Sequence, residues 1–394
     1  MTPLGIYIHI PFCNSKCAYC DFYSRCGTKN EYNEYTEALI NHILEAQMRS
    51  SDYVVDTIYF GGGTPTAIGE KNLIKILAAV YRSFRVDDGC EITCEANPNS
   101  VTLRGLKKLR RAGFDRISFG MQSADASELR VLGRTHTFED VKTAVEWARK
   151  AKFSNISLDL MYGLPSQSIE SFLDSLDAAI GLMPEHISCY SLKLEEGTPL
   201  AERPETLFLP SDDEQADMYL AAVTRLRDEG YEQYEISNFA KEGKLSRHNM
   251  KYWTLGEYWG FGPSAHSLVG RKRFSYIRDT ALYIDAMHTH GEVIDRIETI
   301  NDSGRCGEYL MLGLRTAAGI SGDVLEKKYL TYFDEIEKVL LKYHKTGHTD
   351  FDGHNWRLTP EGFLISNRII GDALDALEES EHLVRPLNGY IRKD

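Results

Sequence analysis

Three cysteines near the start of the chain have a spacing that suits iron–sulfur chemistry. Cys13, Cys17 and Cys20 form a CxxxCxxC pattern directly after an apolar stretch, residues 4–10, which predicts a buried strand that leads into a cysteine loop. Thiolates are soft ligands that match iron, and such a loop can fold around a [4Fe-4S] cubane. Because three cysteines leave the fourth iron with an open coordination site, the pattern indicates chemistry at that iron.

A zinc knuckle and a pair of disulfides are the alternatives for these cysteines. A zinc site usually has a second Cys/His pair roughly a dozen residues on. The next candidate here is Cys26, and no CxxC or HxxxH partner follows it. The sequence begins on the predicted strand without a basic leader, so we expect a reducing, cytoplasmic location and no disulfides.

Further polar residues follow the predicted strands where these end. The glycine-rich segment Gly61–Pro65 comes directly after the second strand, and glycines let the backbone approach a ligand closely. Glu95 and Gln122 end later strands, Asp159 lies within the fifth, and Arg134 lies between the fourth and fifth. A carboxylate can accept two ribose hydroxyls, and a guanidinium can pair with a carboxylate through two hydrogen bonds. Each residue alone would be an ordinary cap or ion pair, but together at one rim they favour a ligand site.

Short apolar runs alternate with amphipathic helical runs over the first half of the chain. The predicted strands are residues 4–10, 54–60, 91–96, 115–121, 156–161 and 186–192, and the predicted helices are residues 31–49, 71–84, 102–112, 138–151 and 168–182. This alternation predicts an α/β fold with a parallel sheet covered by helices. Six such units suggest a partial (β/α)6 barrel, with its site at the carboxyl ends of the strands.

The pattern changes after the predicted barrel. Residues 211–230 predict one long helix that begins at Ser211, and the aromatic and glycine-rich region 231–269 predicts strands and loops without a helix. From about residue 301 the order helix, helix, helix, short hairpin indicates a mainly helical, winged-helix-like module. We therefore expect a barrel over residues 1–205, an extension over 206–298 and a C-terminal domain over 299–394.

Charge and hydropathy exclude two classes of partner. The 394 residues carry a formal net charge of −13 and no long run of Lys or Arg, which argues against nucleic acid as an obligatory partner. No apolar run approaches the roughly 18 residues of a membrane span, so we expect no transmembrane segment and leave peripheral membrane contact open.

The cysteine loop resembles that of the radical S-adenosylmethionine (SAM) superfamily, because Tyr19 stands before the last cysteine of CxxxCxxC. The resemblance implies that the amino and carboxylate groups of SAM chelate the open iron. It implies that reductive cleavage of SAM gives a 5′-deoxyadenosyl radical, a chemistry that belongs to the cofactor. It also implies that the glycine-rich segment after the second strand holds the methionine amino group.

A narrower resemblance is to the oxygen-independent coproporphyrinogen III dehydrogenase (HemN) family and its HemW branch. The matching residues are Tyr7, Cys13, Cys17, Cys20, Tyr19, Gly62, Gly63, Thr64, Glu95, Gln122, Arg134 and Asp159. The resemblance implies that Tyr7, Gly62 and Glu95 contact the SAM on the cluster. It implies that the second-SAM or substrate side is lined by Tyr19, Gly63, Thr64, Gln122, Arg134 and Asp159.

Two departures from the dehydrogenase put porphyrinogen decarboxylation in doubt. Phe22 stands where that enzyme has another cysteine, and its N-terminal extension has no counterpart here. Instead, residues 248–253 read HNMKYW and resemble the HNxxYW motif of HemW-type heme chaperones. An imidazole can ligate heme iron, and Tyr and Trp faces can cover a porphyrin. Residues 260–266 read GFGPSAH and end in His266. Both His248 and His266 are candidate heme ligands. The alternative for His248 is that it only forms a hydrogen bond to a loop carbonyl.

The resemblance implies a HemW-type chaperone that binds a [4Fe-4S] cluster, SAM and heme. Its implied partners are heme-accepting proteins and a flavodoxin- or ferredoxin-type electron donor. The sequence leaves three other hypotheses open: coproporphyrinogen III dehydrogenase, a HemN-like methyltransferase that uses two SAM molecules, and a SAM-binding scaffold without turnover. The resemblance implies that the protein can cleave SAM, and whether this cleavage drives heme release is open.

Overall fold

A computed structural model describes residues 1–202, 207–381, 383–384 and 391–392. The chain divides into two compact units. Unit 1 comprises Met1–Glu232, Phe239–His248 and Gly256–Glu298, and unit 2 comprises Gln233–Asn238, Asn249–Leu255 and Thr299–Asp394. The three-domain division expected from the sequence stays a prediction, and its boundary at residues 205 and 206 lies outside the described residues.

Unit 1 is built on six consecutive parallel strands, β1 to β6, each paired with the next. Their bounds are Thr2–Ile10, Tyr53–Gly62, Val86–Ala96, Arg116–Gln122, Asn155–Tyr162 and His186–Ser191. All six agree with the expected runs within a few residues except β3, which begins five residues earlier than the expected residue 91. Parallel strands covered by helices carry apolar side chains on both faces, and this explains the near-continuous apolar runs.

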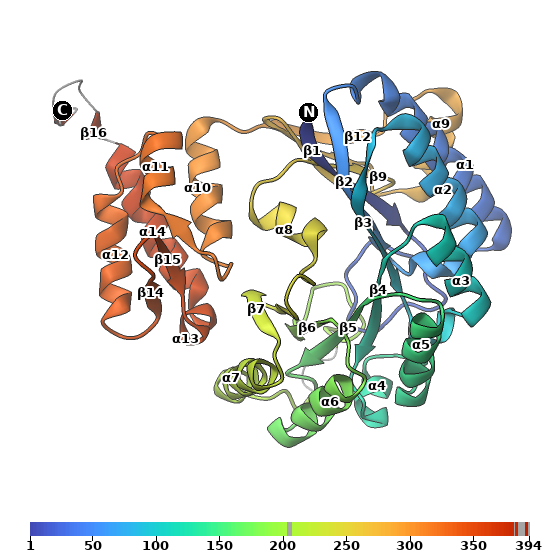
Figure 1. Cartoon of the computed structure of the whole chain (residues 1–394), viewed down its shortest axis with the longest axis horizontal. Coiled ribbons are helices and arrows are strands. Elements are labelled where there is room, and N and C mark those ends of the chain that lie inside the picture. The colour runs from blue at the N-terminus through green and yellow to red at the C-terminus, as the bar shows by residue number, and fades with distance from the viewer. Residues whose placement is uncertain (203–206, 382, 385–390, 393–394) are drawn as a thin grey trace. The chain divides into compact units, whose positions relative to one another are not determined.

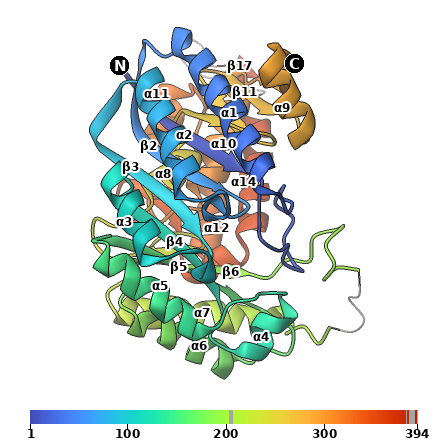
Figure 2. The same cartoon turned by 90° about the vertical axis from the view of Figure 1, so that its right-hand side faces the viewer.

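Helices lie between the strands and cover the outer face of the sheet (Figure 1). Their bounds, α1 to α7, are Lys29–Glu45, Glu70–Ser83, Leu103–Ala112, Ala126–Val131, Phe138–Lys150, Ile169–Gly181 and Asp212–Asp228. Short 3-10 turns, η1 to η3, span Ala46–Arg49, Pro65–Ile68 and Pro98–Ser100. Figure 2 looks onto the layer formed by α1, α2, α3 and α5. The expected (β/α)6 partial barrel is confirmed.

The sheet continues beyond β1 through a second set of strands. β9 pairs in parallel with β1, and β10, β11 and β12 follow outward in that order. On the other side β8 lies next to β6. The bounds of β7 to β12 are Glu232–Glu235, Asn238–Ala240, Tyr258–Phe261, His266–Val269, Lys272–Tyr276 and Ile294–Thr299, and α9 spans Thr280–Thr289. β9 therefore places the GFGPSAH segment beside the strand that leads into the cysteine loop.

The expectation that residues 231–269 contain no helix is wrong. Helix α8 spans Arg247–Trp253 and carries the HNMKYW motif. Its N-terminus is capped from outside, because the Glu91 carboxylate accepts hydrogen bonds from the backbone N–H of Arg247 at 3.3 Å and of His248 at 3.2 Å. This cap comes from a strand about 150 residues earlier in the chain. Local sequence contains no sign of it, and the aromatic residues of the motif favour strand by propensity.

Unit 2 contains the C-terminal module, and its order confirms the winged-helix-like expectation. Helices α10, α11 and α12 precede the β14–β15 hairpin, which pairs with β13 in a three-stranded sheet. The bounds of α10 to α14 are Asp302–Gly313, Gly322–Lys328, Asp334–His344, Pro360–Leu364 and Ser366–Glu381, and those of β13 to β17 are Ile320–Ser321, Thr349–Phe351, Asn355–Leu358, Leu383–Val384 and Ile391–Arg392. Among the described residues, no helix has the length and hydropathy to span a membrane.

Candidate functional site

The cysteine loop leaves the carboxyl end of β1 and is folded back on itself by its backbone. Cys13 N–H donates to the carbonyl of Arg25 at 3.0 Å, and Arg25 N–H donates to the carbonyl of Pro11 at 3.0 Å. All three cysteines of the triad are free thiols; Cys13 is buried and Cys17 and Cys20 are half-buried. The loop therefore presents three unbridged thiols at one end of the barrel.

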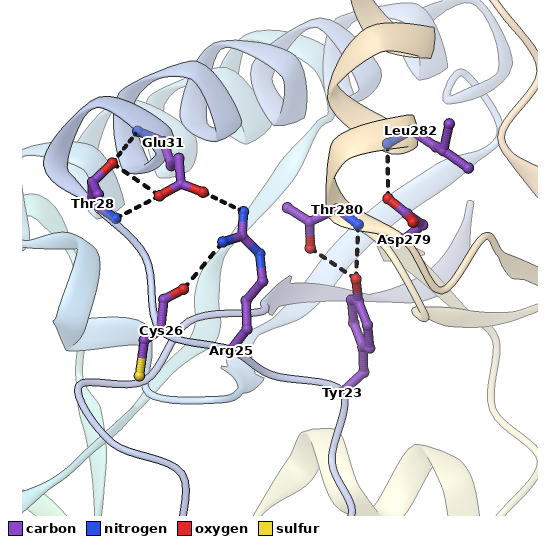
Figure 3. Close-up of polar contacts among 8 residues, drawn as sticks. All are labelled: Tyr23, Arg25, Cys26, Thr28, Glu31, Asp279, Thr280 and Leu282. Carbon is purple, nitrogen blue, oxygen red and sulfur yellow. Dashed lines mark hydrogen bonds and ion pairs between the residues drawn. The ribbon is translucent and has the colours of Figure 1, made fainter.

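Two polar contacts tie the end of this loop to helix N-termini (Figure 3). The Arg25 guanidinium pairs with Glu31 in the first turn of α1 at 2.7 Å and also donates to the carbonyl of Cys26 at 3.1 Å. The Tyr23 hydroxyl accepts from the backbone N–H of Thr280, at the start of α9, at 2.7 Å. These contacts anchor the end of the loop to the first turns of α1 and α9.

Hydrogen-bond donors from two other segments reach the cysteine sulfurs. Thr64 Oγ1 donates to Cys13 Sγ at 3.5 Å, and Arg134 Nη1 donates to Cys17 Sγ at 3.4 Å. The two donors meet at Asn97, whose Oδ1 accepts from Arg134 Nη2 at 2.8 Å and whose Nδ2 donates to Thr64 Oγ1 at 3.3 Å. A continuous polar bridge therefore joins two of the three cysteines across the rim of the barrel.

Asn97 is the residue that the sequence analysis missed. It follows Glu95 by two residues at the end of the same strand and stands before Pro98. Its position at the same strand end as Glu95 was the one sequence signal that could have marked Asn97 as a site residue. Its own backbone is held by Ser100, because Asn97 N–H donates to Ser100 Oγ at 3.1 Å and Ser100 Oγ donates to the Asn97 carbonyl at 2.7 Å.

The glycine segment after β2 packs against the cysteine loop. A Cβ on Gly63 would lie 2.6 Å from the carbonyl oxygen of Phe12 and 3.0 Å from Cys13 Sγ. A Cβ on Gly62, which has a φ of +110°, would lie 2.7 Å from the His9 ring. Thr64 N–H donates to the Phe12 carbonyl at 2.7 Å. Glycine is required here because the backbone of the segment lies directly against the loop.

The donor set fits an iron–sulfur cluster. Burial raises the pKa of the Cys13 and Cys20 thiols, and the neighbouring Cys17 raises both further, so the three groups share one electrostatic environment. Within the described part of the chain, no three His, Cys, Asp or Glu side chains converge as they would around a single metal ion. In a cubane each thiolate binds a different iron, so cluster ligands are spaced more widely than ligands of one ion.

A buried carboxylate lies beside the glycine segment. Glu95 Oε1 accepts from the Tyr59 hydroxyl at 2.7 Å, and burial raises the pKa of Glu95 to about 7. A Cβ on Gly61 would lie 3.2 Å from both carboxylate oxygens. Tyr7 lies nearby on β1, and its hydroxyl shares a hydrogen bond with His9 Nδ1 at 3.0 Å. Burial also raises the pKa of Tyr7, which keeps this phenol neutral.

The other rim residues gather around β4 and β5. Asp159 accepts from Ser118 Oγ at 3.1 Å and from Ser188 Oγ at 2.8 Å, and burial raises its pKa. Gln122, at the end of β4, has a φ of +64°, and the pairing of β4 with β5 shifts its register between Gly120 and Gln122. Tyr19 packs beside a cluster of buried residues, Leu132, Met161, Leu164, Leu192 and Leu200.

The two candidate heme ligands lie in different environments. His248 has no exposed surface, and its Nδ1 shares a hydrogen bond with Thr57 Oγ1 at 2.9 Å. This partner of Nδ1 is a side chain of β2. His266 begins β10, where its side chain is exposed. It lies close enough to His9 to lower the pKa of that imidazole, together with Arg278 and after the larger effect of burial. The two histidines therefore have different neighbours: His248 contacts Thr57, and His266 lies near His9.

Replacing Asn97 with alanine is expected to loosen the cluster. The change removes the acceptor of Arg134 Nη2 and the donor to Thr64 Oγ1, two bonds that each contribute on the order of 1 kcal/mol. We expect the reconstituted variant to lose iron to a chelator about tenfold faster than the unmodified protein. Asn99→Ala is the matched control, because Asn99 is exposed and its Nδ2 donates to Thr135 Oγ1 at 3.0 Å. Equal rates for the two variants would contradict the assignment.

Comparison with known proteins agrees with this architecture. Residues 7–179 match the model of the Radical SAM superfamily, and residues 305–365 match that of the HemN C-terminal domain. The chain is similar to the "Heme chaperone HemW" of Bacillus subtilis, with 36% identity over 94% of this chain and 99% of that protein. It is also similar to the "Heme chaperone HemW" of Haemophilus influenzae, with 38% identity over 94% of this chain and 97% of that protein.

A solved structure and a mammalian relative extend the comparison. The structure of coproporphyrinogen III oxidase (HemN) from Escherichia coli superposes with a TM-score of 0.83 at 23% identity, covering 94% of this chain and 90% of that one. Its low identity makes it evidence for the fold alone. The mouse "Radical S-adenosyl methionine domain-containing protein 1, mitochondrial" is 32% identical over 96% of this chain and 89% of that protein. With relatives above 30% identity that it spans almost completely, the chain belongs to the HemN/HemW family of radical SAM proteins.

Proposed function

We propose that this protein binds a [4Fe-4S] cluster, SAM and heme, and passes heme to acceptor proteins in the cytoplasm, with a flavodoxin- or ferredoxin-type protein as electron donor. The observation that carries the proposal is the loop with three free thiols, two of which receive hydrogen bonds from Thr64 and Arg134. The heme part is supported by the names of the bacterial relatives and by the HNMKYW motif.

Each rim residue has a role in this proposal. Cys13, Cys17 and Cys20 hold the cluster, which when bound supplies an open iron for SAM and an electron for its reduction. The residues proposed to contact SAM on the cluster are Tyr7, Gly62 and Glu95, and those proposed to line the second-SAM or substrate side are Tyr19, Gly63, Thr64, Gln122, Arg134 and Asp159. The glycines admit the ligand to the backbone, and the buried Glu95 carboxylate is an acceptor for ligand hydroxyls.

Access distinguishes the two candidate heme ligands. Ligation by the exposed His266 needs no rearrangement, whereas ligation by the buried His248 requires helix α8 to move. His248 lies in the motif that resembles the one of heme chaperones, so we propose it as the axial ligand in a state with α8 displaced. His266 is the alternative ligand.

A heme titration of the purified protein tests this proposal. We expect a shifted Soret band in the unmodified protein and its loss or displacement in His248→Ala. His266→Ala is measured in parallel, and His290→Ala is the control because His290 is exposed and lies at the end of α9. No Soret shift in the unmodified protein, or an unchanged shift in both His248→Ala and His266→Ala, would contradict heme binding through these residues.

Coproporphyrinogen III dehydrogenase is a second candidate, favoured by the match of residues 305–365 to the HemN C-terminal domain. Phe22, whose side chain is 70% exposed beside the triad, argues against it, because a phenylalanine cannot replace a cysteine as a ligand. An anaerobic assay with reductant, SAM and coproporphyrinogen III distinguishes the two. Formation of protoporphyrinogen would establish the dehydrogenase.

A further inference from the structure

Three aromatic rings lie against one another inside the barrel of unit 1. The rings of Tyr59 and His248 have centroids 5.2 Å apart and planes inclined by 25°. Tyr7 stacks on both, with centroids 6.3 Å from Tyr59 and 6.4 Å from His248. Residues from β1, β2 and α8 therefore form one stack, and His248 cannot shift without changing its contact with Tyr59.

The other end of this stack is the carboxyl group of Glu95. The Tyr59 hydroxyl donates to Glu95 Oε1 at 2.7 Å, and this carboxylate is buried. A bond of this kind to an ionised carboxylate is about twice as strong as a neutral hydrogen bond. Tyr59 is thus the residue that contacts both the Glu95 carboxylate through its hydroxyl and the His248 imidazole through its ring.

Helix α8 is short, with seven residues, and the chain crosses between the two compact units within it. His248 belongs to unit 1 and Asn249 to unit 2. The Glu91 carboxylate accepts hydrogen bonds from the N-terminus of α8. The His248 imidazole contacts Thr57 through a hydrogen bond and Tyr59 through ring stacking. We expect a change at Tyr59 to alter how firmly this seven-residue helix is held.

We infer that Tyr59 is a positioning residue that couples Glu95 to His248, so that SAM bound at Glu95 loosens helix α8 and raises the affinity for heme. This inference rests on the proposed function, in which Glu95 binds SAM and His248 binds heme. Under this inference, SAM binding has a purpose in a heme-binding protein, because it regulates the affinity for heme.

The coupling follows from crowding at one acceptor. A ribose hydroxyl that donates to Oε1 of Glu95 crowds the Tyr59 hydroxyl, whose hydrogen bond of 2.7 Å ends on the same oxygen, and weakens that bond. A weakened hydrogen bond to a buried phenol hydroxyl costs free energy, so the Tyr59 ring moves until its hydroxyl has a good acceptor again. Its contact with His248 then weakens, and α8 leaves its packed position more often. By thermodynamic linkage, heme bound at α8 must raise the affinity for SAM by the same factor.

Hydrogen exchange of α8 tests the coupling without heme. The anaerobically reconstituted protein is measured with and without SAM, and SAM binding is verified by calorimetry. We expect SAM to speed exchange in residues 247–253 about tenfold in the unmodified protein and to leave it unchanged in Tyr59→Phe, which keeps the ring and lacks the hydroxyl. Tyr81→Phe, on the exposed face of α2, is the control and should respond to SAM as the unmodified protein does.

The outcomes separate this inference from the proposed function. If SAM binds but α8 exchanges equally with and without it, or if Tyr59→Phe responds as the unmodified protein does, the coupling is overturned while the proposed function stands. If SAM does not bind at all, both are overturned. A heme titration with and without SAM gives the second readout: we expect heme to bind about tenfold more tightly with SAM, and equally in both conditions for Tyr59→Phe.

Discussion

Cys17→Ser is expected to abolish cluster assembly. A serine hydroxyl stays protonated at neutral pH and is a hard ligand, so it cannot replace the thiolate that Arg134 Nη1 contacts at 3.4 Å. After anaerobic reconstitution, we expect the variant to retain a small fraction of the iron and sulfide of the unmodified protein and to lose the visible charge-transfer absorption. Iron and sulfide analysis and the optical spectrum measure this.

Cys90→Ser is the matched control. Cys90 is half-buried in β3, where its thiol lies near the Glu91 carbonyl, and it belongs to no part of the candidate site. We expect it to assemble the cluster fully. A full cluster in Cys17→Ser, or an equal loss in Cys90→Ser, would show that the triad is not the ligand set.

Gly63→Ala is expected to prevent cluster binding without touching a ligand. The added Cβ would lie 2.6 Å from the Phe12 carbonyl oxygen and 3.0 Å from Cys13 Sγ. Backbone atoms cannot give way as a flexible side chain does, so the cysteine loop must shift, at a typical cost of about 1–3 kcal/mol. We therefore expect reduced thermal stability and iron retention several-fold below that of the unmodified protein.

The same substitution at another glycine separates this effect from a general one. Gly181 ends α6, and a Cβ there would meet no atom within 4 Å. Gly181→Ala should leave both the melting temperature and the iron content nearly unchanged. If Gly63→Ala binds iron as well as Gly181→Ala does, the close approach of the glycine segment to the cysteine loop is not required.

The barrel was predictable from the sequence because its physical causes are local. Strands buried on both faces read as continuous apolar runs, and helix N-caps such as Ser211, which accepts from Glu214 N–H, stand at the expected positions. The cysteine triad and the glycine segment were recognisable for the same reason, since their function requires fixed short spacings. Their roles as ligand-binding residues remain predictions.

Contacts between distant segments of the chain could not be predicted from the sequence. Helix α8 depends on the Glu91 carboxylate, which caps it from another strand, so a local analysis assigned strands and loops to this region. Asn97 acquires its place only when β3 brings it between Thr64 and Arg134. The buried position of His248 likewise follows from its stacking on Tyr59, which periodicity cannot indicate.

Electron paramagnetic resonance of the reduced, reconstituted protein with and without SAM tests the central claim most directly. If Cys13, Cys17 and Cys20 hold a cubane with one open iron, SAM binds that iron and changes the spectrum of the reduced cluster. We expect this change in the unmodified protein and no cluster signal in Cys17→Ser. A spectrum that SAM leaves unchanged, or a protein that takes up zinc in place of a cluster, would contradict the account.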